Sequence, residues 1–198
     1  MNEKFFDIKK EKQDRIINAA LKAFALKGYR HASTDDIVRD AAVSKGILFH
    51  YFESKLGLYE FVYEYSVRFM LLELSQAVES NDLFEVASQV ELAHMRAMKG
   101  YPYMQQFLNR TAAEDVSEAL LAMEEKRGVL EDAYEQIYAQ IDYDAYGGEE
   151  MGRKILKMLD LTVKGLMTER FLDASFQPEM LYEEITGYID MMKTLCKQ

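Results

Sequence analysis

Cysteine and proline are almost absent from this 198-residue sequence. Cys196 is the only cysteine, so the chain cannot form an intramolecular disulfide. Pro102 and Pro178 are the only prolines, which leaves long stretches free to form helix. No apolar run approaches the about 18 residues that span a bilayer, and the first thirty residues lack the apolar segment of a signal peptide. These absences predict a cytoplasmic protein that does not enter a membrane.

The net charge of −10 is unevenly distributed along the chain. Residues 1–52 contain 10 Lys and Arg against 7 Asp and Glu, whereas residues 53–198 contain 14 against 27. The first part is therefore weakly basic and the second strongly acidic. Such an asymmetry indicates a small polyanion-binding part joined to a separate part.

Helical periodicity runs through every long segment, and no segment alternates like a strand. Ile16, Ala20 and Phe24, for example, recur at the spacing of one helix face. We therefore predict an all-α fold. The expected helices cover about residues 9–27, 34–42, 45–52, 55–78, 82–99, 103–110, 113–141, 149–172 and 178–197.

Serine residues mark the starts of three of these helices. Ser33, Ser44 and Ser54 can each accept a hydrogen bond from an orphan amide of the first turn, and Asp36 can reach back to complete a capping box. Two short helices joined by about three residues form a helix-turn-helix. The expected core of this three-helix head consists of Ile16, Ala20, Phe24, Ile37, Ala41, Val43, Leu48 and Phe52.

The same region carries a motif in several separate blocks. Gly28-Tyr29, Ser33-Thr34-x-Asp36-Ile37, Val43-Ser44-Lys45-Gly46-x-Leu48-x-His50-Tyr51-Phe52 and Ser54-Lys55-x-x-Leu58-Tyr59 together resemble the DNA-binding region of TetR-type (tetracycline-repressor-like) regulators. The resemblance covers roughly residues 10–70. It implies a homodimeric regulator whose N-terminal head binds double-stranded operator DNA and whose larger helical body dimerises and holds a small-molecule effector.

A recognition helix meets DNA with its first residues, which here follow Ser44. The residues expected to contact DNA are Ser33, Thr34, Ser44, Lys45, Gly46, Ile47, Phe49, His50 and Lys55. Three positions depart from the family pattern: Ile47 stands where Thr or Ser is usual, Phe49 where Tyr is usual, and Ala42 where Gly is usual. The first two remove hydrogen-bonding groups, and Ala42 suggests a slightly different turn.

The resemblance and the helix pattern together divide the chain by function. Residues 1–54 are the expected DNA-binding head, with its motif at about 33–52, and residues 55–198 are the expected six-helix effector-binding and dimerisation body. The function predicted is sequence-specific repression relieved by a ligand, with the fourth helix as the lever between head and body. Two recognition helices of a dimer would read half-sites about 34 Å or a multiple apart.

In the body, Met and aromatic side chains could line an adaptable apolar cavity. The candidates for this ligand pocket are Met70, His94, Met98, Phe107, Tyr134, Tyr138 and Met158, although for each residue alone a place in the core is favoured. His94 is more simply a satisfied interior histidine than a metal ligand, because no second histidine lies near it in sequence.

Heptad-like apolar spacing in the last two helices predicts a four-helix bundle between two chains. The expected interface residues are Ile155, Leu159, Leu166, Leu181, Ile185, Tyr188, Met192 and Leu195, and the competing interpretation is that both helices simply close the core of one chain. No cofactor, metal or catalytic constellation is indicated, so an enzyme is not expected. Two alternatives stay open. One is a helical small-molecule-binding or scaffold protein that does not bind DNA, and the other is a small all-helical enzyme, which a buried carboxylate–histidine cluster around His94 would favour.

Overall fold

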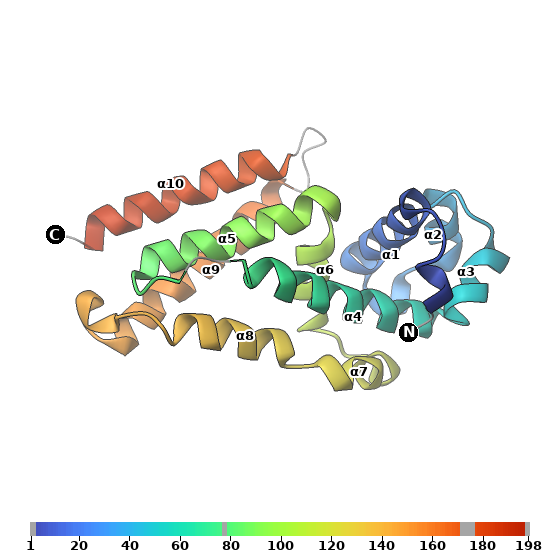
Figure 1. Cartoon of the computed structure of the whole chain (residues 1–198), viewed down its shortest axis with the longest axis horizontal. Helices are drawn as coiled ribbons and strands as arrows, with labels where there is room; N and C mark the ends of the chain where they lie inside the picture. The colour runs from blue at the N-terminus through green and yellow to red at the C-terminus, as the bar shows by residue number, and fades with distance from the viewer. Residues whose placement is uncertain (1–2, 77–78, 171–176, 197–198) are drawn as a thin grey trace. The chain divides into compact units, whose positions relative to one another are not determined.

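The computed structural model describes residues 3–76, 79–170 and 177–196, and within these ranges the chain is helical without strands (Figure 1). The predicted all-α fold is confirmed. Three short 3-10 turns, Glu3–Phe5, Glu124–Lys126 and Tyr143–Tyr146, accompany the α-helices. The α-helices are α1 (Lys10–His31), α2 (Thr34–Asp40), α3 (Lys45–Phe52), α4 (Lys55–Leu74), α5 (Leu83–Gly100), α6 (Met104–Thr111), α7 (Ser117–Met123), α8 (Val129–Tyr138), α9 (Glu149–Arg170) and α10 (Pro178–Cys196).

The helices form two compact units. Unit 1 comprises residues 1–69 and 100–130, and unit 2 comprises residues 70–99 and 131–198. Unit 1 therefore contains the three-helix head together with α6 and α7, and α1 packs against both α2 and α6. This division follows packing, whereas the predicted functional boundary at residue 54 stays a prediction.

The core of the head is the one expected from the sequence. Seven of its eight predicted members are buried, and Val43 is half-buried. Phe24 extends this core towards α4 and α6, with its ring 4.9 Å from that of Tyr59 and 6.2 Å from that of Phe107. Helix α1 thus packs on α2 and α6, and the Phe24 ring also reaches α4.

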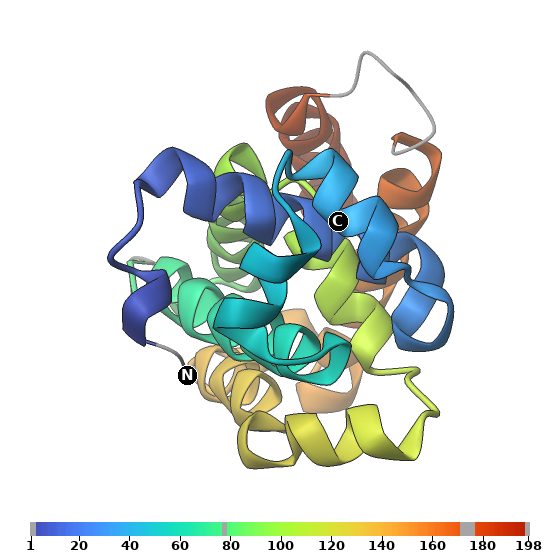
Figure 2. The same cartoon turned by 90° about the vertical axis from the view of Figure 1, so that its right-hand side faces the viewer.

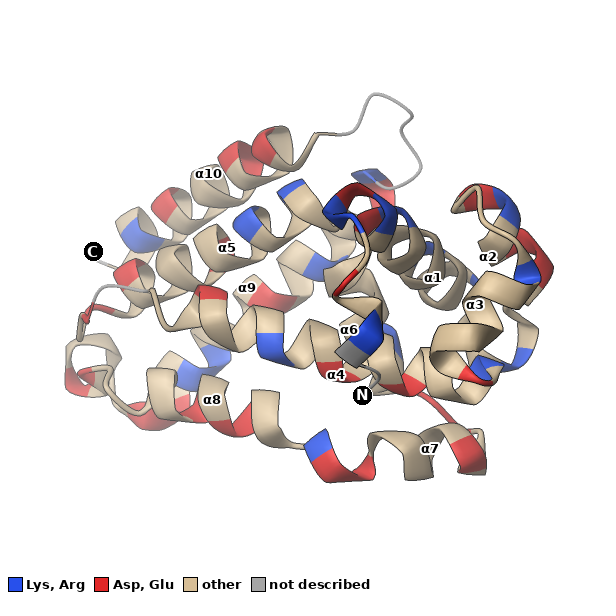
Figure 3. Cartoon of the chain, turned by 45° about the vertical axis from the view of Figure 1, so that its right-hand side comes forward, with Lys and Arg blue, Asp and Glu red and all other residues tan. Residues whose placement is uncertain are grey.

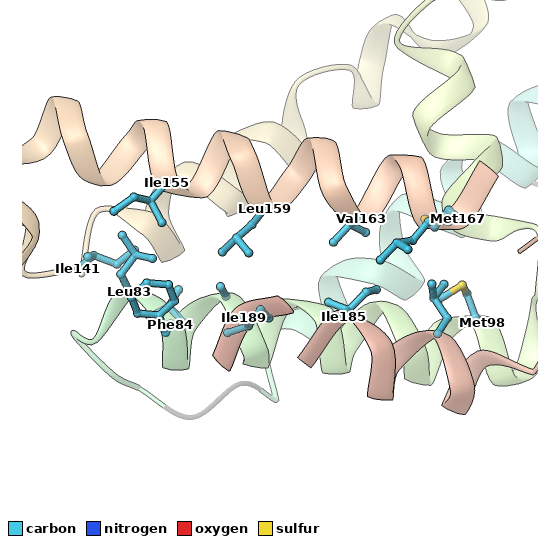
Figure 4. Packing of buried hydrophobic residues seen from close by; sticks show 14 residues of the cluster. Leu83, Phe84, Met98, Ile141, Ile155, Leu159, Val163, Met167, Ile185 and Ile189 are labelled. Atoms are coloured by element: carbon cyan, nitrogen blue, oxygen red, sulfur yellow. The ribbon is translucent and has the colours of Figure 1, made fainter. Parts of the chain in front are cut away.

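Unit 2 has a separate core between α5, α9 and α10 (Figure 4). Leu159 and Val163 of α9 lie on the same side of their helix as Met167, and Ile185 and Ile189 of α10 point into the same cluster. Tyr143 covers Gly152 so closely that a side chain there would collide with its ring. This packing fixes the end of the 3-10 turn Tyr143–Tyr146 against α9.

Some predicted helix limits are wrong. The single helix expected over 113–141 is divided into α7, a 3-10 turn and α8, and Gly128, with a positive φ of 86°, interrupts the helical backbone directly before α8. The fourth helix ends at Leu74, before the predicted end. The expected end points Val78, Leu172 and Lys197 lie outside the described residues.

Candidate nucleic-acid interface

The starts of the three helices in the motif are capped as the sequence predicts. The Ser33 hydroxyl accepts from the Asp35 amide at 3.2 Å, and the Ser44 hydroxyl accepts from the Ile47 amide at 3.2 Å. Ser54 accepts from the amide of Gly57 at 3.0 Å. Each cap satisfies one orphan amide and fixes the residue at which its helix begins.

The proposed capping role of Asp36 is wrong. Its carboxylate accepts from Lys27 at 2.7 Å and from Arg39 at 2.6 Å instead of reaching back to the cap. Hydrogen bonds from Lys27 and Arg39 lower the pKa of Asp36. Asp36 therefore ties the end of α1 to α2.

The turn between α2 and α3 contains an alanine in a conformation that favours glycine. Ala42 has a φ of 53°, in the left-handed region. The chain passes through this turn with the Val43 amide donating to the carbonyl of Val38 at 3.0 Å. Alanine at this position, where the family usually has glycine, therefore strains the backbone by about 1–2 kcal/mol, because a residue with a Cβ disfavours the left-handed region.

The beginning of α3 is exposed and its far side is buried (Figure 2, seen from the side of α3). Leu48 and Phe52 anchor the helix in the head, with 0% and 5% of their surfaces exposed. Of the residues predicted to contact DNA, Ser44, Lys45, Gly46 and His50 are exposed, and Ser33, Thr34, Ile47, Phe49 and Lys55 are half-buried. The predicted contact residues at the start of α3 therefore lie on its open side.

Two of the predicted cations already have partners inside unit 1. The ammonium of Lys45 lies 2.8 Å from a carboxylate oxygen of Asp35, and both side chains are at least half exposed. Lys55 donates to the carbonyls of Arg30 and Ala32 at 3.3 Å each, and its ammonium lies 4.5 Å from the centre of the Tyr29 ring. The pair of Lys45 is open to solvent, whereas Lys55 joins the end of α1 to the start of α4.

Charges of both signs share the surface of the head (Figure 3). On α2, Arg39 pairs with Asp36 and lies 3.8 Å from Asp40, which in turn binds Lys22 of α1 at 3.1 Å. Asp35, also on α2, pairs with Lys45 at the exposed beginning of α3. Nearby aspartates therefore offset part of the positive charge that the sequence predicts for the head.

The predicted pocket residues are divided between the two units, and the pocket itself stays a prediction. Phe107 belongs to unit 1 and packs in its core, whereas the other six belong to unit 2. Met70 and Met98 are buried, and Met158 is 58% exposed, so it lines no enclosed cavity of this chain. Tyr134 and Tyr138 stack at 6.3 Å on the half-buried side of α8.

His94 is a satisfied interior histidine. Its Nε2 lies 2.7 Å from the Tyr134 hydroxyl, and its Nδ1 lies 3.2 Å from a carboxylate oxygen of Glu91. A neutral imidazole has one donor and one acceptor nitrogen, so His94 can satisfy both contacts at once. Burial and the nearby Tyr138 and Glu91 raise the pKa of Tyr134. Within the described ranges, no group of three or more His, Cys, Asp and Glu is placed to hold a metal ion.

Most of the predicted dimer residues are corrected by the structure. Five of them are buried in the core of unit 2 and unavailable to a partner: Ile155, Leu159, Leu166, Leu181 and Ile185. Met192 is half-buried against the same core, and only Tyr188 and Leu195 are exposed. The heptad-like stripe read from the sequence is the inner face of α9 and α10 in this chain, and dimerisation itself stays a prediction.

A second apolar stripe lies on the outer faces of these two helices, and of its members only Tyr188 and Leu195 are predicted from the sequence as interface residues. Its members are at least 38% exposed and recur mainly at spacings of three, four and seven residues: Met151, Met158, Leu161, Met180, Tyr188, Met191 and Leu195. The sequence contains this second set of apolar residues at spacings of three and four, beside the set that forms the core. The sequence alone does not show which of the two sets faces inward.

The fold and the exposed, serine-capped α3 define a helix-turn-helix protein with an additional helical unit. Residues 16–62 match the family described as "Bacterial regulatory proteins, tetR family". The match covers the helix-turn-helix and the first part of α4, so this N-terminal segment is similar to the N-terminal domain of TetR-type regulators. Among the described residues, no helix is long and apolar enough to cross a membrane.

Similar proteins share mainly this domain. The chain is 47% identical over 49 residues to the uncharacterised HTH-type transcriptional regulator YuxN of Bacillus subtilis, covering 25% of this chain and 17% of YuxN. It is 38% identical over 48 residues to the biofilm operon icaADBC negative transcriptional regulator IcaR of Staphylococcus aureus, covering 24% of this chain and 26% of IcaR. The match thus spans about a quarter or less of each relative.

The fold likeness extends over nearly the whole chain. A crystal structure of a TetR family transcriptional regulator from Chloroflexus aurantiacus aligns with a TM-score of 0.61 at 18% identity, covering 98% of this chain and 95% of that one. The architecture beyond the N-terminal domain is therefore shared at the level of helices and their arrangement.

Proposed function

We propose that this protein is a dimeric transcriptional repressor that binds operator DNA with α3 and is released by a small molecule held in its helical body. The single observation that carries DNA binding is the orientation of α3. Leu48 and Phe52 bury one side of the helix, while Ser44, Lys45 and Gly46 leave its capped beginning exposed. The similar protein IcaR is a negative transcriptional regulator, which favours repression over activation.

Lys45 is the proposed phosphate or guanine contact. Its pairing with Asp35 is exposed on both sides, and exposed pairs contribute about 0–1 kcal/mol, so a duplex can displace the carboxylate. The free amides at the start of α3 add a favourable dipole for a phosphate. The remaining predicted contacts, Ser33, Thr34, Ile47, Phe49, His50 and Lys55, stay proposals of the same kind.

Dimerisation is proposed to use the outer apolar stripe of α9 and α10. Seven exposed apolar side chains on two neighbouring helices exceed the scattered single residues normal for a monomer surface. Gly165 and Gly187 are both exposed, and a Cβ at either would meet no atom of the chain within 4 Å, which leaves room for close approach by partner helices. A two-fold arrangement would bring the same stripe of each chain together.

The effector is proposed to act through unit 2. Glu91, His94 and Tyr134 place polar groups among apolar helices there, and α4 runs without interruption from Lys55 in unit 1 to Leu74 in unit 2. A ligand can shift DNA affinity only if it binds one arrangement of the two heads better than the other. Free and effector-bound dimers with unchanged separation of the two α3 helices would contradict this lever.

The decisive experiment selects duplexes from a library with 30 randomised base pairs and measures their affinity at several salt concentrations. We expect a pseudo-palindromic sequence and binding that weakens steeply with salt. Lys45→Ala should weaken binding and reduce the salt slope by about one, whereas Asp35→Asn should strengthen binding because it releases Lys45. Failure to select any duplex at low salt would favour the non-DNA-binding alternative.

A further inference from the structure

The segment that precedes α1 is folded onto the recognition helix. Phe5, in the 3-10 turn Glu3–Phe5, has 0% of its surface exposed. Its ring lies 5.0 Å from that of Phe52 and 5.0 Å from that of Phe61. It also meets the ring of Tyr51 edge to face at 5.7 Å. One side chain thus contacts both the end of α3 and the first half of α4.

A buried glutamine holds this segment in place. The Gln13 amide donates to the carbonyl of Ile8 at 2.7 Å and to the carbonyl of Phe6 at 3.0 Å. Only 6% of Gln13 is exposed, so its hydrogen bonds are made inside the protein. Residues 4–8, which we name the strap, are therefore fixed at one end by Gln13 and at the other by Phe5.

The strap meets α3 and α4 where the backbone turns sharply. Glu53 has a φ of 63°, and the amide of Ser54 donates to the carbonyl of Phe52 at 2.6 Å. A Cβ at Gly57 would collide with that same carbonyl oxygen. This junction contributes to the direction of α3 relative to α4, and the ring of Phe5 packs on that of Phe52 beside it.

We propose that the strap is a positioning element for DNA recognition, with Phe5 as its positioning residue. Phe5 holds the end of α3 against α4, and thereby keeps the exposed beginning of α3 in the orientation that enters the groove. The inference rests on the proposed DNA binding. It differs from a direct contact because Phe5 is buried and offers nothing to DNA.

The test compares Phe5→Ala with Phe6→Ala, a neighbour in the strap that is 41% exposed. Against the selected duplex, Phe5→Ala should weaken binding by about tenfold, the loss expected when roughly a tenth of the molecules keep the competent arrangement. The salt slope should stay unchanged, since no phosphate contact is removed. Phe6→Ala should bind within about twofold of the parent, and Phe5→Leu should recover most of the affinity.

Amide hydrogen exchange separates positioning from general loss of stability. In Phe5→Ala, the amides of α3 should exchange at least about fivefold faster, while those of α5 and α9 keep their parent rates. This measurement needs no DNA, so it remains decisive if no duplex is selected and the proposed function fails. Equal affinities of Phe5→Ala and Phe6→Ala, or unchanged exchange in α3, would overturn the inference. A uniform rise in exchange over the whole chain would also overturn it.

Discussion

Replacement of Gly46 by alanine separates what the folded chain needs from what DNA needs. A Cβ built at Gly46 would have only the Ser44 hydroxyl oxygen nearby, at 4.0 Å, and its φ is not positive. Nothing inside the chain therefore requires glycine at this position. Glycine in a helix nevertheless costs about 1 kcal/mol relative to alanine.

Gly46→Ala should consequently stabilise the protein while weakening its binding to DNA. The gain in unfolding free energy should be up to about 1 kcal/mol, which raises the Tm by roughly 2–4 °C in a chain of this size. If the backbone at Gly46 approaches a duplex closely, the added methyl should cost about 1.4 kcal/mol, or about tenfold in Kd. The two effects have opposite signs, so general damage to the fold cannot produce both.

The assay pairs thermal unfolding with fluorescence anisotropy on the selected duplex. Gly100→Ala is the matched control, because Gly100 ends α5 and a Cβ there would also meet nothing within 4 Å. Gly100→Ala should leave the Kd unchanged. If Gly46→Ala binds DNA as tightly as the parent, the start of α3 is not closely approached and the reasoning is refuted.

Two further predictions concern unit 2. Met191→Glu should raise the Kd of the proposed dimer by about 30-fold, because burying an unpaired carboxylate costs roughly 2 kcal/mol. The control Leu121→Glu, on α7, should leave that Kd unchanged. Light scattering across a dilution series measures both, and an intact Met191→Glu dimer would contradict dimerisation through the outer stripe. Asp82 caps α5, and although burial alone would raise its pKa, hydrogen bonds from the Glu85 amide, the Tyr146 hydroxyl and the Phe84 amide lower it overall. Because the pKa of Asp82 is lower in the folded chain than in the unfolded chain, the ionised carboxylate stabilises the fold. This contribution to the unfolding free energy is complete above about pH 4 and is lost on acidification. Asp82→Asn should therefore show a shallower decline in unfolding free energy below pH 4 than the parent, and parallel curves would contradict the assignment.

Local rules made much of the head predictable from the sequence. Ser33, Ser44 and Ser54 each cap a helix because a serine oxygen and an orphan amide meet within a few residues. The burial of Leu48 and Phe52 followed from helical spacing alone. These features depend on contacts over short stretches of chain.

The errors came from interactions that sequence spacing does not encode. Gly128 interrupts a periodic apolar pattern because its backbone takes a positive φ. A single glycine within a helical pattern does not by itself predict such a φ. Phe5 was not singled out, since its burial depends on Phe61, more than fifty residues away. On α9 and α10, two apolar stripes compete, and the packing of α5 determines which one turns inward.

Asp35 acts as an internal substitute for a phosphate. In the free protein its carboxylate lies 2.8 Å from the Lys45 ammonium, so in the proposed complex a duplex must displace a carboxylate to reach that ammonium. The same carboxylate repels the phosphates of any duplex by the same amount. It therefore shortens the time that the proposed complex spends on random and specific DNA alike, and leaves the choice between them to the base contacts.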